Sequence, residues 1–145
     1  MSEHMDALKS LHTALIDSRN GYQEALEDAE GKGLTPLFRD MITLRNHDAD
    51  ELAGHLTALG EKVDDDGSFM STVHRTVISI RSVLTGLEES ILPALIDGEG
   101  RILEYYDDAL ETAPARSAEH AVLVKQRETL MRKIGEMQRR NEQAA

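Results

Sequence analysis

The stretch that decides the fold is Ser90-Ile-Leu-Pro-Ala-Leu-Ile-Asp-Gly-Glu-Gly-Arg-Ile-Leu-Glu-Tyr-Tyr-Asp-Asp-Ala-Leu110. Its apolar residues recur at steps of three and four, which is the spacing of one face of an α-helix. They are Leu92, Leu95, Ile102, Tyr106 and Ala109. Glu99 lies on the same face, between Gly98 and Gly100. Each glycine costs about 1 kcal/mol relative to alanine inside a helix, so we expect a close approach or room for the carboxylate here.

Amphipathic segments of the same kind cover most of the chain and predict an all-α fold. Thr35-Pro36 is typical of a helix start, and Gly60 is typical of a helix end. The predicted helices cover 2–30, 35–59, 90–111 and 115–143, with a further helical segment at 68–84. No segment shows the alternation that is typical of a β-strand.

The lengths of the connections predict how the helices are arranged. The first and third connections are short and make antiparallel hairpins, whereas the second is long and contains the segment 68–84. We therefore predict a ferritin-like antiparallel four-helix bundle with a long, partly helical crossover between helices two and three. The length of 145 residues fits one domain, residues 1–145.

The composition excludes several classes of partner and site. With 16 Lys and Arg against 27 Asp and Glu, the net charge is −11, which disfavours nucleic acid and anionic membrane surfaces. No segment approaches the ~20 apolar residues of a membrane span, and no secretory signal is recognisable, so we expect a cytoplasmic protein. The chain has no cysteine, so carboxylate and imidazole groups would have to hold any metal.

A polar residue interrupts the apolar face of each long helix near its middle. These residues are Arg19, or Ser18 in a register one residue earlier, then Arg45 with Asp48, Glu99 and Arg127. Buried charges are rare unless they are paired or bind a metal, so we expect these side chains to meet in one layer.

One interpretation of this layer is structural. Arg45 and Arg127 would neutralise Glu99 and Asp48 in a buried charge network that fixes the register of the helices, with no cofactor. On this interpretation, Arg127→Leu leaves Glu99 without its partner and destabilises the bundle by roughly 3–5 kcal/mol.

The alternative interpretation is an incomplete iron or manganese site. Dimetal bundles combine a carboxylate from each of two helices with Glu-x-x-His from the other two. The candidate ligands here are His47, Glu51, Glu99 and Glu128. The pattern is broken because Leu44 stands where a glutamate is needed before His47, and Met131 stands where a histidine is needed after Glu128.

The sequence resembles a bacterial family of ferritin-like four-helix-bundle proteins of unknown function, in short motifs distributed along most of the chain. The motifs are Asp17-x-x-x-Gly21-Tyr22, Leu37-Phe38, His47-x-x-x-Glu51-Leu52, Leu59-Gly60, Gly67-Ser68, His74-Arg75, Gly98-Glu99, Tyr106 and Ala109-Leu110. The chain departs from the family pattern at Gly100, where an acidic residue is usual, and at Val77, where an aromatic residue is usual. The resemblance implies a ferritin-like fold, an intracellular setting and a link to stress or metal handling, without a demonstrated reaction.

Together these observations predict a non-catalytic binding or assembly module that forms a homodimer through an apolar helix face. The alternative is a degenerate metal-binding or oxidase protein of the diiron or dimanganese type.

Overall fold

The computed structural model describes residues 2–29, 34–61 and 91–144. These residues form four α-helices and no strand, which confirms the predicted all-α class for this part of the chain. The helices are α1 (Ser2–Ala29), α2 (Thr35–Ala58), α4 (Leu92–Thr112) and α5 (Ala118–Ala144). The crossover helix predicted at 68–84 lies outside the described residues.

Local signals set the ends of the helices. Helix α2 has Pro36 in its first turn, where a missing amide donor costs nothing, and Leu34 rather than Thr35 is its N-cap. At its other end, Gly60 adopts a positive φ of 88°, and the amides of Gly60 and Glu61 donate to carbonyls of the last turn. This is a Schellman motif. Helix α5 begins at Ala118 rather than at the predicted 115, because the Ser117 hydroxyl caps its first turn.

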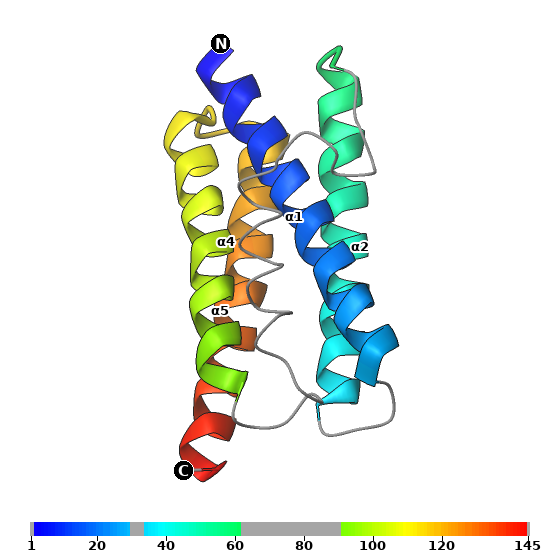
Figure 1. Ribbon diagram of the computed structural model, residues 1–145. Coiled ribbons are helices and arrows are strands. Elements are labelled where there is room, and N and C mark those ends of the chain that lie inside the picture. Colours follow the sequence, from blue (N-terminus) through cyan, green and yellow to red (C-terminus); the bar gives the residue numbers. More distant parts are fainter. Residues whose placement is uncertain (1, 30–33, 62–90, 145) are drawn as a thin grey trace.

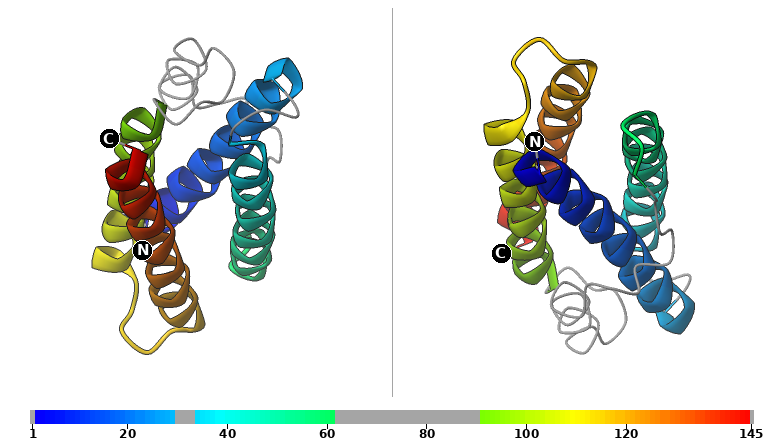
Figure 2. Two further views of the ribbon diagram at one scale, coloured as in Figure 1. Left: turned by 90° about the horizontal axis from the view of Figure 1, so that it is seen from below. Right: turned by 90° about the horizontal axis from the view of Figure 1, so that it is seen from above.

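The helices form two hairpins that lie side by side. In Figure 1, α1 runs downward and α2 upward, while α4 runs upward and α5 returns downward. Helix α2 therefore ends at the opposite end of the molecule from the start of α4. Helix α1 packs against both α2 and α4, α4 packs against α5, and a contact of α2 with α5 closes the ring. Figure 2 shows α1 crossing obliquely from beside α4 to beside α2.

Two apolar clusters fill the interior. One cluster is formed by residues such as Leu11, Leu52, Tyr106, Leu123 and Leu130. The other is formed by residues such as Tyr22, Phe38, Met41, Leu95 and Met137. Along α1, α2 and α4, the buried residues between the two clusters are polar, so a polar layer separates them.

In the described part of the chain, no helix has the continuous apolar length that a membrane span requires.

Candidate functional site

The centre of the polar layer is an ion pair between Arg45 of α2 and Glu99 of α4. Arg45 is 1% exposed and Glu99 is 2% exposed, so both charges are removed from water. The Arg45 Nη2 donates to Glu99 Oε1 in a short contact. Since both residues lie between apolar turns of their helices, burial of those turns forces the two charges together.

Helix α1 contributes two further groups to this pair. The Tyr22 hydroxyl donates to Glu99 Oε2 over 2.5 Å, and the Arg45 Nε donates to Ser18 Oγ over 3.3 Å. Both carboxylate oxygens of Glu99 are therefore occupied, one by a guanidinium and one by a phenol. The ion pair connects three helices, and any shift of α1, α2 or α4 along its axis would break one of these contacts.

The electrostatics of the buried groups agree with this arrangement. Burial acts to lower the pKa of Arg45, but Glu99, followed by Tyr22, Tyr106 and Asp48, together outweigh it, and the pKa of Arg45 is raised above its ordinary value. Burial, followed by the charge of Glu99, raises the pKa of Tyr22 well above its ordinary value. Arg45 therefore stays charged and Tyr22 keeps its proton, which is the form that can donate to Glu99.

A second set of contacts connects α5 to the layer. Tyr106 donates its hydroxyl proton to Gln126 Oε1 over 2.8 Å. The amide nitrogen of Gln126 donates to the backbone carbonyl of Asp48 over 3.3 Å and to Glu51 Oε1 over 2.9 Å. Because Gln126 both accepts and donates, it joins α4 and α2 without adding a charge to the interior.

A group of possible metal ligands lies on α2 beside these contacts. His47, Asp48 and Glu51 bring one ligand atom each to within 4.8 Å of one another, and no other such group of three or more occurs in the described residues. The His47 Nδ1 lies 3.2 Å from Asp48 Oδ1. Burial raises the pKa of Asp48, and the neighbouring His47 and Arg45 oppose that effect only in part. Burial therefore disfavours the ionised form of the Asp48 carboxylate.

Comparison with known families gives one result. The model of a family described as Domain of unknown function (DUF2383) matches residues 3–112. The chain belongs to this family. The match includes α1, α2 and α4, and it therefore contains Arg45, Glu99 and Tyr22 of the central ion pair. Gln126 and the rest of α5 lie beyond the DUF2383 match. No curated protein and no solved structure matches the chain.

Three of the sequence-predicted site residues, His47, Arg127 and Glu128, do not reach the layer, and the side chain of His47 is 69% exposed. Arg127 has a side chain that is 31% exposed, and its Nε donates to Asp107 over 2.6 Å on the outside of the α4 and α5 hairpin. Glu128 is exposed on α5. The expected pairing of Arg127 with Glu99 is therefore replaced by Arg45 with Glu99. The reason is the rotation of α5. The next buried residue after Leu123 is Gln126, three positions later, so Arg127 faces outward.

Other residues of the layer gave a weaker signal in the sequence. Ser18, in the register one residue earlier, is buried, whereas Arg19 is half-buried and donates to Asn46 over 3.1 Å. Tyr22 fitted the apolar spacing, which indicates burial but not what its hydroxyl contacts. The expected close approach near Glu99 does not occur at Gly100, since a Cβ added there would meet no atom within 4 Å.

Proposed function

We propose that this DUF2383 protein is a ferritin-like helical bundle in which a buried ion pair takes the central position of a metal centre, and that it acts as a non-catalytic assembly module. The parallel direction of α2 and α4 supports the ferritin-like arrangement, because a long crossover is needed to join such helices. The burial of the Arg45 and Glu99 pair carries the proposal. We also propose that the protein is cytoplasmic and that it binds neither nucleic acid nor membranes.

The residues of the layer do not fit a dimetal centre. Glu99 has one oxygen against the Arg45 guanidinium and the other against the Tyr22 hydroxyl. A guanidinium at this point would repel a divalent cation, and a carboxylate that already accepts two strong hydrogen bonds is a poor ligand. His47 is exposed on α2 and Glu128 is exposed on α5, so they do not converge on Glu99.

Two exposed apolar side chains on α5 support the assembly role. Val124 is 37% exposed and Met131 is 48% exposed, and their separation of seven residues places them on one face of the helix. A second copy of the chain that packs against this face would cover both apolar side chains together with the charged Arg127 and Glu128 that lie between them.

Light scattering on the purified chain tests the assembly role. We expect a dimer, and we expect Met131→Glu to convert it to a monomer while the helical circular dichroism stays unchanged. Leu59→Glu is the matched control, because Leu59 is 46% exposed but lies at the end of α2. A wild-type monomer, or equal loss of the dimer in both variants, would rule out the face of Val124 and Met131.

A second candidate function is divalent metal binding by His47, Asp48 and Glu51. The convergence of one imidazole and two carboxylates within 4.8 Å favours it, because these donors suit manganese, iron or zinc. A bound cation would also favour the ionised form of Asp48, which burial disfavours. This site would be separate from the Arg45 and Glu99 pair, so both functions are compatible with one fold.

Calorimetric titration with Mn²⁺ and Zn²⁺, together with elemental analysis of protein purified without chelator, tests this candidate. One ion per chain that is lost in His47→Ala but kept in His55→Ala would establish the site. His55 is the matched control because it also lies on α2, two turns later. Binding that survives His47→Ala, or no binding at all, would eliminate the candidate. Stoichiometric metal lost in Glu99→Ala would instead overturn the primary proposal.

A further inference from the structure

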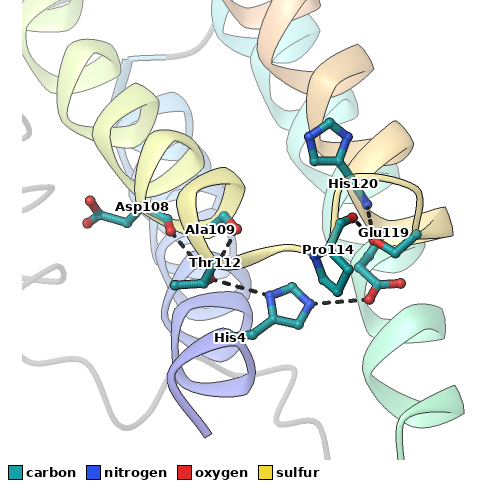
Figure 3. A network of polar contacts seen from close by, with 8 residues as sticks. His4, Asp108, Ala109, Thr112, Pro114, Glu119 and His120 are labelled. Atoms are coloured by element: carbon teal, nitrogen blue, oxygen red, sulfur yellow. Dashed lines mark hydrogen bonds and ion pairs between the residues drawn. The ribbon is translucent and has the colours of Figure 1, made fainter. Parts of the chain in front are cut away.

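At one end of the bundle, His4 connects three helices (Figure 3). Its Nε2 lies 3.2 Å from Glu119 Oε1 in the first turn of α5. Its Nδ1 lies 3.4 Å from the hydroxyl of Thr112 at the end of α4. The side chains of His4 and Glu119 are only 11% and 13% exposed, so the contact is shielded from water. The start of α1 is thus connected to both α4 and α5 through one imidazole.

The protons available to this network can be counted. The Thr112 hydroxyl has one proton, and its oxygen also lies 3.2 Å from the carbonyl oxygen of Ala109. If His4 is neutral with its proton on Nε2, then Nδ1 needs the Thr112 proton, and the bond to Ala109 is lost. If His4 carries both ring protons, Nε2 donates to Glu119, Nδ1 donates to the Thr112 oxygen, and Thr112 donates to Ala109. Both contacts of His4 in Figure 3 are then satisfied at once, and Thr112 keeps its proton for the carbonyls of the last turn, of which Ala109 is nearer than Asp108.

We propose that His4, Thr112 and Glu119 form a proton-sensitive clasp that holds the start of α1 against α4 and α5 when His4 is protonated. Loss of one ring proton removes the charge that pairs with Glu119 and leaves one hydrogen bond of the set without a proton. Proton binding and closure of this end of the bundle therefore favour each other.

The charged groups around the clasp support this direction. Helix α5 brings Glu119 to the ring, and helix α2 brings His55 near enough to act on the charge of Glu119. Helix α4 contacts the ring through the uncharged Thr112, and the carboxylate of Asp108 points away from His4 in Figure 3. Burial acts to raise the pKa of Glu119, but its own backbone amide and His4 outweigh it, so the pKa of Glu119 is lowered.

The sign of the pH dependence follows from these two groups. The ion pair is complete only where His4 is charged and Glu119 is ionised. The lowered pKa of Glu119 keeps its carboxylate ionised in mildly acidic solution, and imidazole is the side chain whose charge changes between about pH 5 and 8. The clasp is therefore closed in mildly acidic solution, and it opens as the pH rises above this window.

Hydrogen exchange and urea unfolding of the full chain at about pH 5.5 and about pH 8 test the proposal. In the wild type, after correction for the intrinsic rates, we expect the amides in the second turns of α1 and α5, which are the first with helical acceptors, to be about two- to fivefold better protected at the lower pH. We expect His4→Gln and Glu119→Gln to abolish this difference. His120→Gln is the matched control, because His120 contributes only its backbone amide to the contacts in Figure 3.

The same variants give a second, global readout. From the higher to the lower pH, the wild type should gain about two- to fivefold in its folding equilibrium constant relative to His4→Gln, and His120→Gln should follow the wild type. Equal protection of these amides in the wild type at both pH values would overturn the proposal. The proposal would also be overturned if the ratio of the folding equilibrium constants of the wild type and His4→Gln were the same at both pH values.

Discussion

Replacement of Arg45 with leucine is expected to destabilise the bundle by about 3–5 kcal/mol. The reason is the burial of its partner, since Glu99 is 2% exposed and cannot regain water when the guanidinium is removed. The Tyr22 hydroxyl still donates to one oxygen of Glu99, but it carries no charge to balance the carboxylate. The variant therefore keeps the full cost of a buried charge and loses the attraction that offset it.

The size of this effect makes it easy to measure. Domains of this kind have unfolding free energies of about 5–15 kcal/mol, so the loss is a large fraction of the total. For a chain of about this length it corresponds to a fall in Tm of roughly 6–20 °C. Urea unfolding followed by circular dichroism gives the free energy directly, and the slope of the transition shows whether the native state has changed.

Arg127→Leu is the matched control for this experiment. It removes the same type of side chain from a site that is 31% exposed and pairs with Asp107 on the surface. Exposed pairs of this kind contribute about 1 kcal/mol or less. If Arg45→Leu costs no more than Arg127→Leu, the guanidinium of Arg45 is not buried against Glu99 and the reasoning is refuted.

Three further results are expected from the same unfolding assay. Gly54→Ala and Gly100→Ala should each stabilise the protein by about 0.5–1 kcal/mol, because a Cβ at either position meets no atom within 4 Å; a loss in either variant would reveal a steric role for that glycine. Tyr22→Phe should cost about 1.5–3 kcal/mol, because it removes a buried hydrogen bond to the charged Glu99; a cost near zero would contradict that bond. The pKa of Asp48 is raised in the fold, so its contribution to stability is largest below about pH 4 and is lost as the pH rises through the raised value. The free energy of unfolding of Asp48→Asn should therefore rise relative to that of the wild type as the pH increases. A constant difference between the two unfolding free energies across this range would be inconsistent with the raised pKa.

The sequence was sufficient to predict helices because the apolar spacing is regular over long segments. The stretch around Glu99 is the clearest case, since its apolar residues recur through 92–109 and are buried in α4. The polar interruptions at Arg45 and Glu99 could be located by the same counting, because a charge on an apolar face is conspicuous.

The partners within the layer could not be predicted in the same way. Steps of three and four from Leu123 reach either Gln126 or Arg127, and the sequence contains nothing local that decides between them. The choice depends on the rotation of α5 against α4 and α2, which is a property of the packed bundle. The hydroxyl of Tyr22 is a similar case, because spacing identifies a buried ring but not the atom that its oxygen contacts.

The central claim is that Arg45 and Glu99 stabilise the bundle as a pair, and a double-mutant cycle with Arg45→Met and Glu99→Gln measures this most directly. We expect each single variant to be strongly destabilised and the double variant to recover most of the loss, giving a coupling energy of about 2–3 kcal/mol. Additive losses, with a coupling energy near zero, would contradict the claim.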